Sequence, residues 1–123
     1  MTPLVIVGAG GHGRELLDII EALAAVGDTT YEFAGFVDDG DIDAEVVGRR
    51  DAELLGDTDV LAGIEAHYVL GVGKSAIRAT LDAKLTSFGR RAATLVHPLA
   101  SVASDNIIAP GVVLTRDAWD KGL

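Results

Sequence analysis

The sequence predicts an α/β fold with a parallel sheet, and two observations support this prediction. Short apolar runs rich in β-branched residues, such as residues 4–7, end at glycine, as strands buried on both faces of a parallel sheet do. Longer segments between these runs carry apolar residues at helical spacing. Because strands that alternate with helices form right-handed βαβ units, we expect a Rossmann-like domain over residues 1–96.

The first strand and the first helix are joined by a glycine-rich turn. Residues 4–7 form the expected strand, and from Arg14 the apolar positions follow one helical face as far as Gly27, a residue type that favours helix ends. Between them, the stretch GAGGHG at residues 8–13 has the spacing G-x-G-x-x-G. This context, after a strand and before a helix, is the one in which the motif binds phosphate groups.

The remaining elements follow from the same criteria. A second long helix is expected from an N-cap at Ser75 to Gly89, and a short one over residues 60–64, capped by Asp57 or Thr58. The acidic segment 38–58 has no clear period, so it is either a functional loop or contains an element that the pattern does not reveal. Three further strands are expected, over residues 33–37, 68–72 and 93–96.

Composition excludes several classes of protein. Of the 123 residues, 49% are hydrophobic and 24% are charged, which is typical of a globular domain. The net charge of −9 disfavours nucleic acid and anionic membranes as partners. No apolar run approaches the ~20 residues of a membrane span, and the N-terminus lacks signal-peptide features, so we expect a cytoplasmic protein. Without cysteine there is no disulfide, thiol nucleophile or thiolate metal site.

The charge is unevenly distributed along the chain. Between Glu15 and Glu65 acidic residues far outnumber basic ones, and only Arg49 and Arg50 are positive. From Ala66 onward, Lys and Arg exceed Asp and Glu. An anionic ligand would therefore find its cations mainly in the second half, where four candidates are Lys74, Arg78, Arg90 and Arg91.

The glycine turn at residues 8–13 allows more than one ligand. The helix that follows it would present free N–H groups and the positive end of its dipole to an anion. Asp38, at the end of the second strand, stands where NAD-binding domains hold the ribose, and Asp39 stands beside it. The two carboxylates suit a nucleotide without requiring nicotinamide, or they simply begin the acidic loop. The turn itself could also serve only to pack the helix on the strand.

A second glycine turn, GVGKS at residues 71–75, ends the third predicted strand. It is not a Walker A motif, because Tyr68 occupies the position of the leading glycine. Lys74 and Arg78 fall on one helical face, where they suit a diphosphate or sugar hydroxyls. For His12 and His97 we expect contact or packing roles rather than catalysis. No catalytic residue and no metal site is predicted.

The C-terminal stretch follows a hexapeptide repeat. Val96, Val102, Ile108 and Leu114 recur every six residues, with small Ala100 at the fifth place of the first hexad, and Ala118 at that place of the last one. Hexads of this kind form a left-handed parallel β-helix with three sides per coil. The next apolar place holds Asp120. Residues 97–123 are therefore expected to form only the first coil of such a β-helix.

Taken in order, the stretches GAGGHGRE, GFVDD, LLGD, GVGKSAIR and ATLVHP leading into hexads resemble the NeuD/PglD-like family of sugar O- and N-acyltransferases. The resemblance implies a nucleotide-sugar-binding domain joined to a β-helix that binds acetyl-CoA and assembles into trimers. The glycine loop would approach the diphosphate or sugar, the two aspartates the uridine, and the second turn the rest of the pocket. The substrate-binding residues predicted in this way are Gly10, Gly11, His12, Gly13, Asp38, Asp39, Gly73, Lys74, Ser75 and Arg78.

The function implied by the resemblance is UDP-sugar binding for an acetyltransferase of bacterial surface-glycan precursors. The family's catalytic histidine lies in later coils, and no histidine follows His97 here. This chain is thus expected to bind its substrate without turnover, as a monomer or weak oligomer, and acetyl-CoA belongs to the complete enzyme. Two alternatives remain: an NAD(P)-binding half-domain of an oxidoreductase, and a non-catalytic assembly module.

Overall fold

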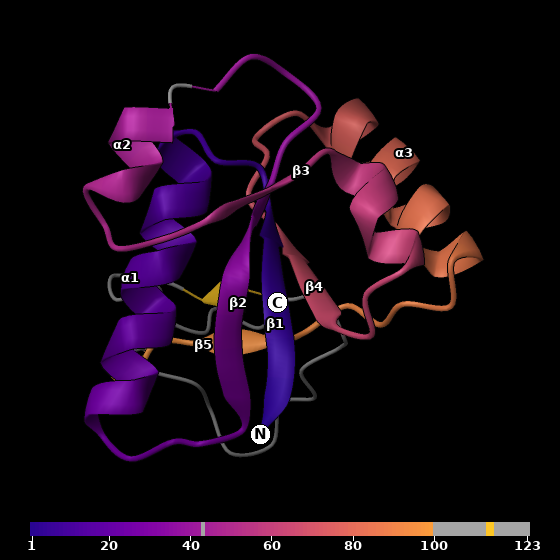
Figure 1. Cartoon of the computed structure of the whole chain (residues 1–123). Coiled ribbons are helices and arrows are strands. Elements are labelled where there is room, and N and C mark those ends of the chain that lie inside the picture. The colour runs from indigo at the N-terminus through magenta and orange to yellow at the C-terminus, as the bar shows by residue number, and fades with distance from the viewer. Residues whose placement is uncertain (43, 100–112, 115–123) are drawn as a thin grey trace.

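The computed structural model describes residues 1–42, 44–99 and 113–114, and it contains a four-stranded parallel sheet. The strand order is β3-β2-β1-β4, so β1 lies inside the sheet between β2 and β4 (Figure 1). The strands are β1 (Thr2–Val7), β2 (Tyr31–Val37), β3 (Leu54–Gly56) and β4 (His67–Leu70). This arrangement confirms the predicted α/β, Rossmann-like sheet.

Helices cover both faces of the sheet. In Figure 1, α1 and α2 lie to one side of the strands and α3 lies to the other. The helical elements are α1 (Gly11–Ala25), α2 (Ala44–Gly48), the 3₁₀ helix η1 (Thr58–Ala62) and α3 (Ser75–Ser87). Both long helices were predicted. The short helix predicted over residues 60–64 corresponds to η1, which begins two residues earlier and has Asp57 as its N-cap, whereas α2 was not predicted.

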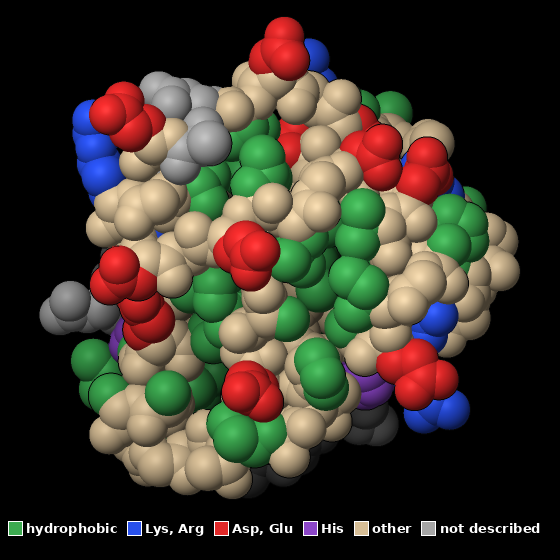
Figure 2. All heavy atoms as spheres, viewed as in Figure 1, with side chains coloured by type: hydrophobic (Ala, Val, Ile, Leu, Met, Phe, Trp, Pro, Cys, Tyr) green, Lys and Arg blue, Asp and Glu red, His purple; other side chains and the backbone are tan. Residues whose placement is uncertain are grey.

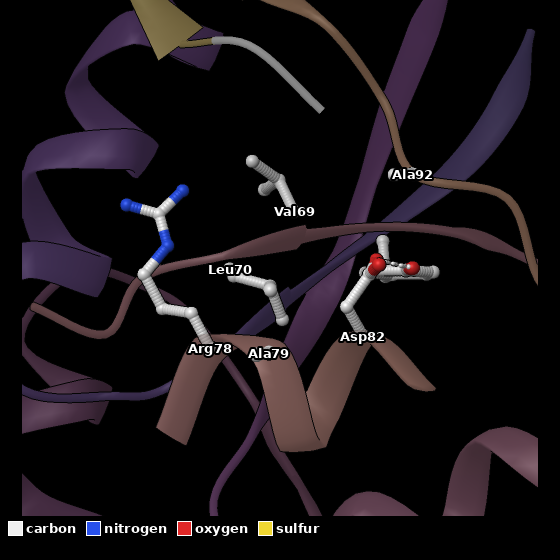
Figure 3. A pocket seen from close by; sticks show the side chains of 7 residues that line it. Val69, Leu70, Arg78, Ala79, Asp82 and Ala92 are labelled. Carbon is white, nitrogen blue, oxygen red and sulfur yellow. Dashed lines mark hydrogen bonds between the residues drawn. The ribbon is translucent and has the colours of Figure 1, made fainter. Parts of the chain in front are cut away.

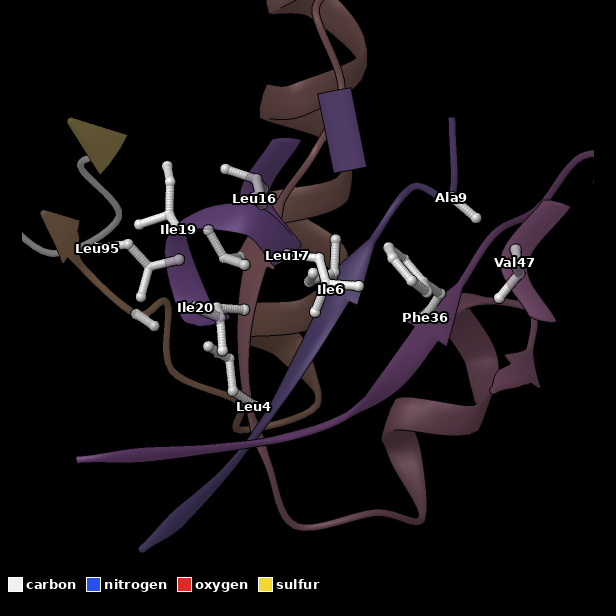
Figure 4. Packing of buried hydrophobic residues seen from close by; sticks show 12 residues of the cluster. Leu4, Ile6, Ala9, Leu16, Leu17, Ile19, Ile20, Phe36, Val47 and Leu95 are labelled. Carbon is white, nitrogen blue, oxygen red and sulfur yellow. The ribbon is translucent and has the colours of Figure 1, made fainter. Parts of the chain in front are cut away.

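The core has two layers, one on each side of β1. Leu4 and Ile6 point to the α1 side and pack with apolar residues of that helix and with Phe36 (Figure 4). Val5 and Val7 point to the opposite side, where α3 contributes Leu85. These four β1 side chains are at most 1% exposed, which explains why the strand is continuously apolar rather than alternating.

The acidic segment 38–58 contains two elements that the sequence pattern did not reveal. Helix α2 has five residues and β3 has three, so neither is long enough to show a period. Strand β3 pairs with β2 at the edge of the sheet, with a register shift between Phe36 and Val37. The segment therefore contains two short elements and is not a single long loop.

Several predicted boundaries differ in the structure, among them those of α3, β4 and the strand expected over 93–96. Ser75 is the first residue of α3, and Lys74 occupies the N-cap position without a side-chain cap. Strand β4 ends at Leu70, before the glycine turn. The expected fourth strand, over 93–96, joins the sheet only through a bridge between Ala92 and Tyr68, and the N–H of Ala93 donates to the carbonyl of Tyr68 at 2.7 Å.

After this bridge the chain leaves the main sheet. Strand β5 (Leu95–Val96) pairs in parallel with β6 (Val113–Leu114), so that Leu95 lies opposite Val113, 18 residues further along the chain. This offset equals three hexads, the length expected for one coil. The other hexad positions, including Val102 and Ile108, lie outside the described residues, and the β-helix itself remains a prediction.

Candidate functional site

The strand order places a topological switch point between β1 and β4. From β1 the chain continues to β2 and β3 on one side and then crosses to β4 on the other. In parallel α/β sheets, ligands bind outside the carboxyl ends of the strands at such a point. Two glycine turns lie there, the one after β1 and the one after β4, and together they are called the loop pair below.

Three glycines of the loop pair pack directly against one another. A Cβ atom on Gly13 would lie 1.7 Å from the carbonyl oxygen of Gly8, and one on Gly71 would lie 2.6 Å from the Cα atom of Gly13. Gly8 also has a φ of +106°, a conformation that L side chains rarely adopt. These three positions need glycine for the fold itself, since the first turn of α1 sits against the backbone of β1 and β4.

At Gly10 and Gly11, by contrast, packing does not require glycine. A Cβ atom at either position would meet nothing within 4 Å, and both residues are exposed. Gly10 is the N-cap of α1, its φ is −80°, no side chain caps the helix, and the first turn has no acidic residue. The N-terminus of α1 therefore faces open space with its backbone N–H groups and the positive end of its dipole.

His12 connects the two turns of the loop pair. A Cβ atom on Gly73 would lie 3.0 Å from Nε2 of His12, so the imidazole ring packs against the backbone at Gly73. His12, Gly73 and the neighbouring Lys74 are all exposed. The structure thus brings together the predicted residues of the first turn and of the second, with an aromatic nitrogen between them.

Asp38 supports the glycine loop from the end of β2. Its Oδ2 accepts the N–H of Ala9 at 2.9 Å, and its Oδ1 accepts the N–H of Gly40 at 2.8 Å. The carboxylate is half-buried. Each oxygen accepts one backbone hydrogen bond here and retains capacity for a second.

Asp39 turns away from the glycine loop and binds Thr58 of η1. Its carboxylate accepts the Thr58 N–H at 2.8 Å and the Thr58 hydroxyl at 2.9 Å. Lys84 of α3 donates to the same hydroxyl at 2.7 Å and forms an ion pair with Asp59 at 2.8 Å. The hydrogen bond to Asp59 raises the pKa of Lys84 above its usual value. Sequence reasoning missed Thr58 and Lys84 here, because their partners lie on other elements.

Arg78 lies on a cavity between α3 and the edge of β4. This cavity has a volume of about 270 Å³, and Figure 3 shows Arg78 and Asp82 projecting from α3 around it. The hydroxyl of Tyr68 donates to Asp82, and burial is the main reason that the pKa of Tyr68 is raised. No predicted residue of the first turn lines this cavity.

Two other predicted residues, Ser75 and His97, lie at exposed or locally bonded positions. Ser75 is exposed at the start of α3. Nδ1 of His97 accepts the N–H of Leu99 at 3.0 Å, which is a local turn contact. Within the described ranges, no three His, Asp or Glu side chains are grouped as metal ligands, and no helix is long and apolar enough to cross a membrane.

The chain is similar to known proteins over most of its length. Residues 3–85 match the model of the PglD N-terminal domain. The acetyltransferase domain of PglB from Neisseria gonorrhoeae FA1090, in complex with acetyl coenzyme A, superposes with a TM-score of 0.75 and 27% identity over 96% of this chain and 55% of that one. PerB from Caulobacter crescentus, in complex with CoA and GDP-perosamine, superposes with a TM-score of 0.73 and 26% identity over 97% of this chain and 56% of that one.

The chain therefore spans somewhat more than half the length of these structures. Comparison with curated protein sequences gives no significant match.

Proposed function

The chain belongs to the PglD N-terminal domain family, and from this premise we propose that it binds a nucleotide sugar, in particular a UDP-sugar, for a sugar acetyltransferase. The observation that carries the proposal is the open N-terminus of α1 beside Gly10 and Gly11 at the switch point. A diphosphate placed there accepts hydrogen bonds from backbone N–H groups and is stabilised by the helix dipole. PerB, a structural relative, was crystallised with the nucleotide sugar GDP-perosamine.

The second turn of the loop pair supplies the other side of the proposed pocket. The imidazole of His12 seated on Gly73 closes the gap between the two turns, and Lys74 next to it adds a cation for the phosphates. Gly13 has a structural part in this pocket, because its missing side chain lets α1 approach β1. Ser75 and Arg78 extend along α3 from Lys74 and would reach the sugar.

In this proposal, Asp38 and Asp39 both support the neighbouring backbone and recognise the uridine. Asp38 holds the glycine loop through Ala9, and Asp39 holds η1 through Thr58. Both oxygens of Asp38 and Oδ2 of Asp39 accept one hydrogen bond each, so a ribose hydroxyl or a base N–H can still bind to them. We assign the uridine to this end of the pocket.

For the complete enzyme, the proposal is transfer of an acetyl group from acetyl-CoA to an amino or hydroxyl group of a bacterial surface-sugar precursor, in the cytoplasm and in a trimer. A general base would deprotonate the acceptor group for attack on the thioester. None of the described residues is assigned as that base or as an acetyl-CoA contact. This chain is proposed to bind and orient the acceptor.

Calorimetric titration with UDP-N-acetylglucosamine tests the binding proposal. We expect saturable binding by the chain, and loss of that binding in Gly11→Leu, whose side chain would fill the space before α1. Gly48→Leu is the matched control, because Gly48 is also an exposed helical glycine with nothing within 4 Å of a Cβ atom. A folded chain that binds neither UDP nor UDP-sugar overturns the proposal, and binding of NADH instead would favour the oxidoreductase alternative.

A further inference from the structure

A second group of cations meets on the outer face of α1, away from His12 and Gly73. Here a shallow cavity of about 370 Å³ lies between the start of α1 and the turn that follows α2. Figure 2 shows Lys or Arg side chains at this corner of the molecule, over the position of α2 in Figure 1. The cavity, called the arginine groove below, is lined by Gly11, Arg14, Glu15, Asp18, Arg49 and Arg50.

The composition of the groove is unusual for this chain. Between Glu15 and Glu65, Arg49 and Arg50 are the only basic residues in a strongly acidic stretch. The fold carries both of them to Arg14, across more than thirty positions of sequence. Three arginines therefore line one cavity in a protein whose net charge is −9.

The three arginines differ in their partners. Nη2 of Arg50 lies 2.7 Å from a carboxylate oxygen of Asp18 and 2.7 Å from one of Glu21, so its charge is already compensated. Within the part of the chain that the structure describes, the side chains of Arg14 and Arg49 form no hydrogen bond or ion pair. Arg14 is nevertheless half-buried. Two arginines without a direct hydrogen-bond or ion-pair partner among the described residues thus border the same space.

This pair suits a phosphate group. A guanidinium presents several N–H donors in a planar fork that matches phosphate oxygens, and two forks can share one dianion. Gly11, the first residue of α1, lines the same groove and adds the positive end of the helix dipole. Two negative charges oppose an anion here: that of Glu15, and one of the pair Asp18 and Glu21, because these two carboxylates share the single positive charge of Arg50.

We propose that the arginine groove binds a phosphate dianion through Arg14 and Arg49, on the outer side of α1, where it shares only Gly11 with the loop pair. The dianion is either free inorganic phosphate or the phosphate of a nucleotide that extends from the loop pair past Gly11. The proposal does not depend on the sugar-binding function, because its probe is inorganic phosphate alone.

Titration of the full chain with inorganic phosphate at low ionic strength, followed by backbone and arginine side-chain NMR signals, tests this site. We expect saturable shifts of the side-chain signals of Arg14 and Arg49, about tenfold weaker binding in Arg14→Gln and in Arg49→Gln, and tighter binding in Glu15→Gln. Arg91→Gln is the control, because it removes the same charge from an exposed arginine that lines a different cavity. Unchanged amide spectra elsewhere show that each variant is folded.

Two outcomes overturn the proposal: no saturable shift in the wild-type chain, or equal weakening by Arg91→Gln, which would mean that only net charge matters.

The source of the dianion is found by repeating the titration with UDP present. If UDP displaces phosphate and Arg14→Gln weakens UDP, the groove holds a nucleotide phosphate. If phosphate binds at saturating UDP, the groove holds free phosphate. Phosphate binding without any UDP binding supports the groove and contradicts only the proposed nucleotide-sugar function.

Discussion

Two kinds of glycine stand side by side in the turn after β1. Gly8 and Gly13 are enclosed by backbone, whereas Gly10 and Gly11 face open space. The G-x-G-x-x-G motif therefore divides into residues that serve the fold and residues that leave room for a ligand. The division follows from contact geometry, which spacing in the sequence does not show.

Alanine substitutions separate the two kinds of glycine. Gly13→Ala should lower the free energy of unfolding by about 4 kcal/mol or more, because its Cβ atom would overlap the carbonyl oxygen of Gly8 at 1.7 Å. Gly11→Ala should leave stability unchanged or raise it by up to about 1 kcal/mol, since alanine favours the helix. Urea unfolding followed by circular dichroism measures both, and equal losses in the two variants would contradict the division.

Asp38 offers a second test at the residue scale. Asp38→Ala removes the acceptor for the N–H of Ala9, a half-buried hydrogen bond of 2.9 Å, and should cost about 1–3 kcal/mol of unfolding free energy. Because the glycine loop loses its support, binding of UDP-sugar should weaken as well. Asp41→Ala, an exposed acid in the same segment, is the control and should change neither quantity.

At the scale of elements, one polar network joins three of them. Asp39 after β2, Thr58 of η1 and Lys84 of α3 are connected by hydrogen bonds of 2.7–3.0 Å. Thr58 is 1% exposed, and its hydroxyl both donates and accepts within this network. The network fixes α3 relative to the carboxyl end of β2, and thereby fixes the two sides of the proposed pocket.

Lys84→Met should reveal the network through its pH dependence. The raised pKa of Lys84 means that its stabilising contribution is complete below its usual value of 10.5 and is lost as the pH rises through the higher pKa of the folded state. The variant should therefore be about 1 kcal/mol less stable than wild type near neutral pH. This difference should shrink above about pH 10.5. Urea unfolding at pH 7 and at pH 11 measures it, and a difference that does not depend on pH would indicate lost packing instead.

At the scale of the whole molecule, the sheet carries one apolar layer on each face. Ile6 belongs to the layer under α1 and Leu85 to the layer under α3, and both side chains are 0% exposed. The central strand β1 contributes to both layers. The two layers should therefore unfold together rather than one after the other.

Core truncations test this cooperativity. Ile6→Ala and Leu85→Ala should each lower the free energy of unfolding by about 2–5 kcal/mol, because each leaves a cavity in a closed layer. Each variant should still unfold in one transition that is the same by far-ultraviolet dichroism and by tyrosine absorbance. Separate transitions in either variant would show that the layers are independent.

The sequence by itself determined the α/β class, the two long helices, the buried strand β1 and the glycine turns, because these features depend on local periodicity and on residue type. It did not determine α2 and β3, which are too short to show a period, nor the departure of residues 95–96 from the main sheet. Only the tertiary structure decided which glycines touch backbone, that Asp39 binds Thr58, and that Arg14 and Arg49 border one cavity. These are spatial relations that local sequence patterns do not encode, and they exist only once the strands are ordered and the crossing helices are packed on them.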